Sequence, residues 1–183
     1  MTLYREGEND RIYGDDGNDA IGGNDGHDRI DGGLGNDRIY GDAGKDQLRG
    51  NEGKDQISSL ADNDRLYGGA GNHVLSGDSG RDLFYFTEAL DGRRNVDRIS
   101  DFNVADDTVR LDDAVLTGFA RGVLSADAFT SGGQATDAAD RIIHDSRSVN
   151  LYYDSDGAGS AAQIRFANLG AHVQLTNSDF DIV

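Results

Sequence analysis

Apolar residues recur at a fixed interval of nine positions along the first half of the chain. A nine-residue unit repeats nine times without a gap between residues 5 and 85, and its eighth position is apolar in every copy. These nine residues are Ile12, Ile21, Ile30, Ile39, Leu48, Ile57, Leu66, Leu75 and Phe84. Each unit therefore predicts one short strand with a single inward side chain. One such side chain buries too little surface to stabilise a unit alone, so the units must stack into a continuous core.

The polar positions of the unit point to a specific chemistry. Gly occupies positions one and four in seven of the nine copies, as in Gly32-Gly33-Leu34-Gly35-Asn36-Asp37. Glycines allow a tight turn, and such a turn exposes several backbone carbonyls. Calcium takes about six to eight hard oxygen ligands, which carbonyls and carboxylates supply. Position six is Asp in eight copies: Asp10, Asp19, Asp28, Asp37, Asp46, Asp55, Asp64 and Asp82.

This arrangement of Gly, Asp and apolar positions resembles the calcium-binding repeats of RTX proteins. The resemblance implies an all-β fold, a parallel β-roll in which two units form one coil and units two places apart in the sequence are stacked. It also implies calcium ions between stacked turns, held by position-six carboxylates and by backbone carbonyls of the first four turn positions. The implied carboxylate pairs are Asp10 with Asp28, Asp19 with Asp37, Asp28 with Asp46, Asp37 with Asp55, Asp46 with Asp64, and Asp64 with Asp82.

The same resemblance implies the turn residues that hold the ions through their backbone. They are Gly14, Asp15, Asp16, Gly17, Gly23, Asn24, Asp25, Gly26, Gly32, Gly33, Leu34, Gly35, Gly41, Asp42, Ala43, Gly44, Gly50, Asn51, Glu52, Gly53, Gly68, Gly69, Ala70 and Gly71. Three units depart from the pattern. The first unit and the unit at residues 59–67 lack both glycines, and His73 replaces the Asp of the eighth. Imidazole suits transition metals better than calcium, so we expect about four to six ions in the roll.

The charge of the chain is consistent with calcium binding and argues against nucleic acids and anionic membranes as partners. The chain carries 34 acidic and 17 basic residues, a net charge of −17. Such a chain lacks the basic face that nucleic acids or anionic membranes require. Strong like charge with many glycines is otherwise typical of a disordered linker, so ion binding and folding should be coupled. No Cys is present, the amino terminus is not that of a cleaved secretory leader, and no apolar stretch is long enough to span a membrane.

The second half of the chain differs in composition and predicts a separate region. Residues 5–85 contain 18 of the 26 glycines, so we divide the chain into a calcium-binding roll at 5–85 and a capping region at 86–183. Short strands are predicted at 98–102, 108–111 and 141–144. A β-hairpin is predicted between 149–153 and 163–166, and single helical turns at 125–129 and 176–180. Stacked rolls need a terminal element to cover their open edge, and this β-rich region is the candidate.

The capping region resembles the carboxy-terminal region of serralysin-type metalloproteases and related exported RTX proteins. The matching segments include Asp97-Arg98-Ile99-Ser100-Asp101-Phe102 and the last residues Asp179-Phe180-Asp181-Ile182-Val183. The resemblance implies a secreted bacterial protein that leaves the cell by the type I pathway, with its carboxy terminus read by an ABC transporter. It also implies that calcium, scarce in the cytosol and abundant outside, triggers folding after export.

No catalytic motif is visible in the sequence. A zinc-binding His-Glu-x-x-His helix is absent, and His27, His73, His144 and His172 are interpreted as surface or turn residues. A Gly-x-Ser-x-Gly elbow and a phosphate-binding loop are also absent. The acidic pairs 106–107 and 112–113 are interpreted as solvated strand ends, with extra calcium ligands as the alternative. Residues 154–159 are interpreted as a hairpin turn, with a calcium site as the alternative, because Asp154-Ser155-Asp156-Gly157 is similar to the start of an EF-hand loop. The chain is therefore predicted not to be an enzyme.

Two further functional classes stay open. The first is a polysaccharide-binding or adhesin module, since Tyr67 and Tyr85 are eighteen residues apart and should be stacked on one face. Such a pair could stack on sugars or simply fill the strand surface. The second is the non-catalytic tail of a secreted metalloprotease, lipase or epimerase, whose catalytic domain would precede residue 1. The favoured prediction is a calcium-binding β-roll that supports the secretion and folding of an exported protein.

Overall fold

Short strands joined by tight turns form nearly all the regular structure of the protein. A computed structural model describes residues 2–4, 7–170 and 173–183. The strands of the first half are β1 Thr2–Tyr4, β2 Arg11–Tyr13, β3 Ala20–Gly22, β4 Arg29–Leu34, β5 Arg38–Ala43, β6 Gln47–Gly53, β7 Gln56–Ala61, β8 Arg65–Gly71 and β9 Val74–Ser76. Those of the second half are β10 Leu83–Phe86, β11 Asp97–Ile99, β12 Thr108–Leu111, β13 Gly122–Val123, β14 Phe129–Ser131, β15 Ile142–Asp145, β16 Asn150–Tyr153, β17 Ile164–Asn168 and β18 Phe180–Ile182.

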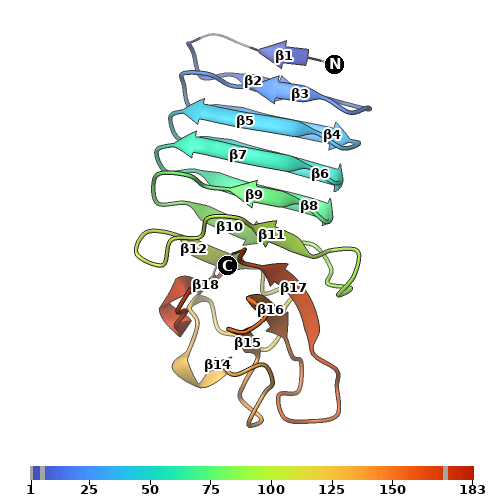
Figure 1. The fold of residues 1–183 in the computed structure, drawn as a ribbon, viewed down its shortest axis with the longest axis vertical. Coiled ribbons are helices and arrows are strands. Elements are labelled where there is room, and N and C mark those ends of the chain that lie inside the picture. The colour runs from blue at the N-terminus through green and yellow to red at the C-terminus, as the bar shows by residue number, and fades with distance from the viewer. Residues whose placement is uncertain (1, 5–6, 171–172) are drawn as a thin grey trace.

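Successive strands of the first half alternate between two parallel sheets, as Figure 1 shows. One sheet has the order β1-β3-β5-β7-β9-β11-β17-β16-β15-β14, and the other has the order β13-β18-β12-β10-β8-β6-β4-β2. Strands two places apart in the sequence pair in parallel with a register of eighteen residues, so Ile21 lies beside Ile39, and Ile39 beside Ile57. This arrangement confirms the predicted all-β fold and the parallel β-roll.

The interior of the roll is a column of the position-eight side chains. All nine are buried, with exposed fractions between 0 and 3%. Each buried side chain of this size stabilises the fold by about 1.5–3 kcal/mol relative to an exposed one. Several strands are longer than predicted: β4 and β6 also include turn positions, because Gly33 and Asn51 continue the pairing into the stacked turns.

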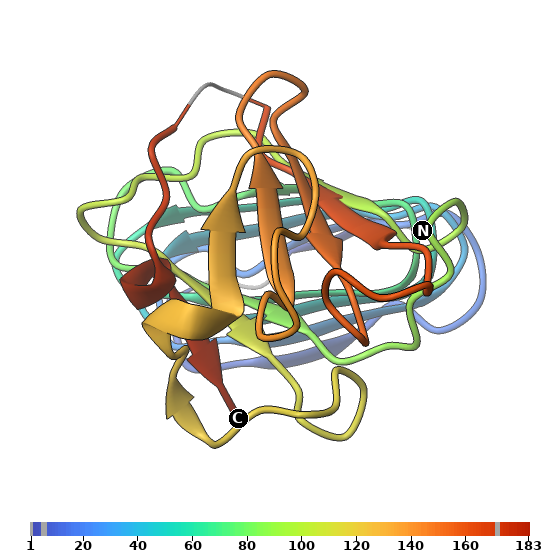
Figure 2. The ribbon, with the colours of Figure 1, turned by 90° about the horizontal axis from the view of Figure 1, so that it is seen from below.

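The capping region closes both sheets at one end of the roll (Figures 1 and 2). β11 pairs with β9 and β17, and β12 pairs with β10 and β18, so both sheets continue into the cap. The predicted hairpin is confirmed, because β16 and β17 are antiparallel. The predicted helical turns are confirmed as the 3-10 helices η1 Ala126–Ala128 and η2 Asn177–Asp179.

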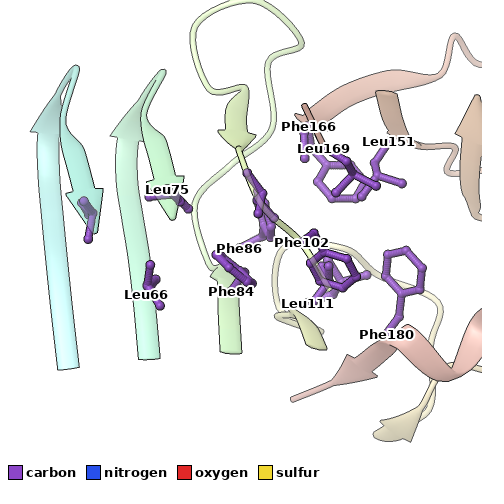
Figure 3. Packing of buried hydrophobic residues seen from close by; sticks show 14 of the residues in the cluster. Leu66, Leu75, Phe84, Phe86, Phe102, Leu111, Leu151, Phe166, Leu169 and Phe180 are labelled. Atoms are coloured by element: carbon purple, nitrogen blue, oxygen red, sulfur yellow. The ribbon is translucent and has the colours of Figure 1, made fainter. Parts of the chain in front are cut away.

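Aromatic residues join the core of the roll to the core of the cap (Figure 3). The rings of Phe84 and Phe102 are 5.9 Å apart, and those of Phe86 and Phe166 meet edge to face at 5.1 Å. The division of the chain at residue 85 stays a prediction, since β10 contributes residues to both sides of it.

Two remaining expectations concern residues of the irregular first unit and His172, and the possibility of a membrane span. Residues 5 and 6 of the irregular first unit, and His172, lie outside the described residues. Among the residues that are described, no helix is long and apolar enough to cross a bilayer.

Candidate metal centre in the stacked turns

The turns between the strands stack into two columns, one along each side of the roll. The first column consists of residues 14–19, 32–37, 50–55 and 68–73, and the second of residues 23–28, 41–46, 59–64 and 77–82. Backbone hydrogen bonds connect neighbouring turns of a column, such as that from the Gly26 amide to the Ala43 carbonyl at 2.9 Å. The turn residues that the sequence pointed to are therefore brought together in these columns.

The position-six aspartates form a ladder along each column, and we call each hydrogen-bonded pair of residues in it a rung. The backbone amide of each donates to Oδ1 of the aspartate in the next turn, over 2.7 to 2.9 Å. All six predicted carboxylate pairs are joined in this way: Asp10–Asp28, Asp19–Asp37, Asp28–Asp46, Asp37–Asp55, Asp46–Asp64 and Asp64–Asp82. The Oδ1 atom of the later aspartate in each pair thus accepts a hydrogen bond, while its Oδ2 atom takes no part in this contact.

The second oxygens are buried without hydrogen-bond partners. Among the described residues, Oδ2 of Asp28, Asp37, Asp46 and Asp82 is inaccessible to solvent and accepts no hydrogen bond. Buried polar atoms are normally satisfied, so an orphaned carboxylate oxygen calls for a missing partner. An oxygen that carries negative charge requires a donor or a cation.

These oxygens lie directly against the position-one glycines, and we call each such glycine, with the carboxylate and carbonyl oxygens beside it, a cradle. A Cβ atom added to Gly32 would lie 2.5 Å from Asp37 Oδ2 and 2.9 Å from the Gly50 carbonyl oxygen. The same atom on Gly41 would lie 2.5 Å from Asp46 Oδ2 and 2.9 Å from the Ser59 carbonyl oxygen. A carboxylate and a carbonyl from neighbouring turns therefore converge where glycine leaves space. Such a set of hard oxygens fits a calcium ion.

Burial makes these carboxylates weak acids as long as no cation accompanies them. It raises the pKa of Asp46 to about 7, with further contributions from the charges of Asp64 and Asp28. Burial likewise raises the pKa of Asp64 to about 6 and of Asp82 to about 7. The ladder therefore concentrates negative charge in a place that disfavours it.

His73 fills one cradle with its own side chain. Its Nδ1 lies 3.0 Å from Asp55 Oδ2 and 3.2 Å from the Asp55 amide nitrogen. Burial lowers the pKa of His73, but the hydrogen bond to Asp55 and the charges of Asp97 and Asp55 outweigh it, so the pKa lies above its ordinary value. The interpretation of the histidines as surface or turn residues was wrong for His144, which is buried in β15. His73 lies in a turn but is buried, and His27 is exposed.

Ser59 fills another cradle. Its side chain is fully buried, and its hydroxyl donates to the Gly77 carbonyl at 3.0 Å. A hydrogen bond from Ser59 also lowers the pKa of Asp64, against the larger effect of burial. The turn nonetheless keeps its place in the second column, because Asp62 adopts a φ of 77° at position four and the Asp46 amide still donates to Asp64 at 2.8 Å.

Two aspartates that the repeat pattern did not include extend both ladders into the cap. The amide of His73 donates to Asp97 Oδ1, and the amide of Asp82 donates to Asp107 Oδ1, each at 3.0 Å. The spacings are 24 and 25 residues instead of eighteen. The tripeptide Asp-Arg-Ile at 97–99 repeats that at 37–39 and could have identified Asp97. The same tripeptide at 140–142 belongs to no rung, since Asp140 accepts hydrogen bonds from its own loop.

The comparison with known families agrees with this geometry. Residues 6–30, 22–57 and 49–84 match the RTX calcium-binding nonapeptide repeat. No curated protein matches the chain significantly. The matched residues contain both columns of turns, the aspartate ladders and the cradles. Residues 6–84 are thus RTX calcium-binding nonapeptide repeats.

Proposed function

We propose that the chain is a non-catalytic calcium-binding module that folds when calcium enters its cradles. The observation that carries this proposal is the set of buried Oδ2 atoms without partners, at Asp28, Asp37, Asp46 and Asp82 among the described residues. When bound, calcium supplies positive charge and links two stacked turns. The chain supplies carboxylates and carbonyls that are already in register.

The proposed ions lie in four cradles of the repeats. These are the cradles at Gly14, Gly23, Gly32 and Gly41, with the carboxylate pairs Asp19–Asp37, Asp28–Asp46, Asp37–Asp55 and Asp46–Asp64. The cradles of Asp55 with His73 and of Asp64 with Asp82 already contain the His73 ring and the Ser59 hydroxyl. We propose that these two hold no ion. The pair Asp10–Asp28 belongs to a turn that includes residues 5 and 6, outside the described residues.

A first experiment counts the ions. Native mass spectrometry in saturating calcium should find calcium on the wild-type chain and no replacement by magnesium, which prefers a stricter octahedral site. The substitution Ser59→Gly should add one ion, and His73→Asp at least one, because each reopens a cradle. Ser58→Gly and His27→Asp make the same chemical changes outside the cradles and should leave the count unchanged.

The two parts of this proposal fail in different ways. A wild-type chain that binds no calcium would contradict the function itself. A wild-type chain that binds calcium, with an unchanged count in Ser59→Gly and His73→Asp, would contradict only the assignment of the closed cradles.

The ion-free roll should also depend on pH. The folded-state pKa values of Asp46, Asp64 and Asp82 lie at about 6 to 7, above the ordinary value of about 4. Their contribution to stability is therefore full below about pH 4 and is lost as the pH rises through 6 to 7. Circular dichroism without calcium should show more β-structure at about pH 5 than at about pH 8. Asp46→Asn should reduce this difference, and an ion-free spectrum that is the same at both values would contradict the expectation.

With calcium present, the dependence on pH reverses. Protons and calcium compete for the same carboxylates, so the calcium concentration at half-folding should be higher at about pH 5 than at about pH 8.

We further propose that calcium-driven folding serves export through a type I transporter, and that the folded chain is extracellular. The position of the carboxy terminus supports this proposal. Phe180 and Ile182 are buried in β18, which pairs with β12. A transporter could read these residues only before the cap folds, so a low-calcium cytosol would keep the carboxy terminus available.

The tyrosine pair supports a structural role more than sugar binding. The rings of Tyr67 and Tyr85 are stacked at 4.3 Å with an interplanar angle of 13°, as the spacing predicted. Arg49 and Arg110 lie over Tyr67 and Tyr85, at 4.4 and 5.9 Å from the ring centres. The ring faces therefore already have partners in the protein. Polysaccharide binding and an upstream catalytic domain stay predictions.

A further inference from the structure

The last turn of the second column ends in a buried carboxylate although the repeat pattern stops there. Asp82 is 1% exposed, and its Oδ2 has no hydrogen-bond partner in the described part of the chain. A Cβ atom added to Gly77 would lie 2.5 Å from this oxygen. The turn therefore places a carboxylate oxygen over its position-one glycine, as at Gly32 and Gly41, but the atoms nearest to this Cβ all belong to Asp82, because no repeat follows to add a carbonyl.

A segment of the cap takes the place of the missing turn. The Asp82 amide donates to Asp107 Oδ1 at 3.0 Å, and the Thr108 amide donates to the Asp82 carbonyl at 2.9 Å. β10 and β12 then pair in parallel, with Leu83 beside Thr108. Asp107 thus has the same relation to Asp82 that Asp64 has to Asp46. Its Oδ2 accepts the Asn103 amide at 2.9 Å, which fixes the carboxylate in the rung.

The surroundings of this rung contain negative charge and no compensating ion pair. The charged groups that act on Asp82 are Asp107, Asp64 and Asp101, all of them carboxylates. Asp101 lies beside the turn, where it accepts the Gly77 and Asp78 amides at 3.2 and 2.6 Å. Within the described ranges, no salt bridge involves Asp82, Asp101 or Asp107. Buried carboxylates held together in this way require a cation.

We propose that Asp82 and Asp107 form a calcium site that joins the roll to the cap, outside the nonapeptide repeats. This inference rests on the proposed function, since it applies the same cradle chemistry one rung further. Calcium accepts carboxylate oxygens in a less regular geometry than the octahedron that magnesium demands. The ion would link turn 77–82 to the segment 101–107, two parts of the chain that the repeat pattern does not connect.

The test compares ion counts in neighbouring carboxylate variants. Asp107→Asn keeps an oxygen for the Asp82 amide but removes the charge, and it should bind one calcium ion fewer than the wild type by native mass spectrometry. Asp106→Asn is the matched control, because Asp106 is exposed and its carboxylate accepts a hydrogen bond from the side-chain amide of Asn103. Its ion count should equal that of the wild type.

A second variant closes the cradle without changing a carboxylate. Gly77→Ser places a hydroxyl where Ser59 has one in the adjacent turn of the same column, so the fold tolerates serine at this position of the turn. It should also lose one ion. Gly132→Ser is its control, because nothing lies within 4 Å of a Cβ atom at Gly132.

The outcomes separate this inference from the proposed function. Loss of one ion in both Asp107→Asn and Gly77→Ser, with unchanged controls, supports the site. If Asp107→Asn does not fold, the count of Gly77→Ser decides. A folded Gly77→Ser or Asp107→Asn that retains the wild-type number of ions overturns the site while the calcium-dependent roll stands. A wild type without bound calcium overturns the proposed function as well.

Discussion

Removal of calcium is expected to unfold the β-roll almost completely at neutral pH. Each of the four proposed repeat cradles contains two buried aspartates, and the backbone amide of one donates to the carboxylate of the other. The effective penalty for removing an uncompensated ion from water is several kcal/mol. A domain of this size is stable by only about 5–15 kcal/mol. Four uncompensated cradles would therefore consume the whole stability of the roll.

Far-UV circular dichroism measures this effect directly. The spectrum in excess EGTA should be that of a largely disordered chain, and calcium up to about 10 mM should restore the β-sheet spectrum in a cooperative transition. Magnesium at the same concentration is the control and should restore little. A β-rich spectrum in EGTA would mean that the apolar column and the cap suffice, and that the cradles contribute little to folding.

Gly44→Ala is expected to be the most damaging single substitution among the turn glycines. Gly44 has a φ of 126°, and a Cβ atom there would overlap the carbonyl of Gly26 in the preceding turn of the column. Alanine is strained in this conformation, and relief of the overlap would separate the two turns. The strain and the loss of an inter-turn hydrogen bond together should lower the free energy of unfolding by about 2–4 kcal/mol.

Gly17→Ala isolates the contribution of backbone strain to this effect. Gly17 occupies the same position of its turn, with a φ of 129°, but nothing lies within 4 Å of its added Cβ atom. It should therefore suffer the backbone strain without the overlap. Chemical denaturation in saturating calcium compares the two variants. Equal losses of stability would show that backbone conformation, and not the close approach of stacked turns, sets the requirement for glycine.

The regular part of this structure could be predicted because a single nine-residue period determines its geometry. A fixed spacing of nine places Ile30 inward and Asp37 at a turn, and an eighteen-residue coil then stacks Asp37 on Asp55. The period ends at the cap, and beyond it only the repeated tripeptide Asp-Arg-Ile could point to Asp97, whereas no signal of this kind points to Asp107. Asp97 and Asp107 lie on the ladders only because loops of unequal length return the chain to the same rungs.

The substituted positions and the cap required the structure for a different reason. His73 was expected to weaken a site, but the sequence did not indicate that its ring reaches Asp55 and fills the cradle. Ser59 likewise appeared in the sequence only as a substitution of the position-one glycine, although its hydroxyl occupies the cradle of its turn. In the cap, the strands were predicted but their partners were not. β12 pairs with β18 across about seventy residues without any periodicity to fix the choice.

The two long connections also bear on how a chain of this kind can change in length. One rung joins residues 24 apart and the next joins residues 25 apart, yet β9 still pairs with β11 and β10 with β12. Extra residues inserted at a turn therefore form a loop outside the solenoid and do not change the pairing of the strands. Loss of one nine-residue unit would instead transfer every later strand to the opposite sheet. Evolution or engineering can thus lengthen the roll by whole coils of two units and add loops at the turns, whereas insertion or loss of an odd number of units would move every later strand to the opposite sheet.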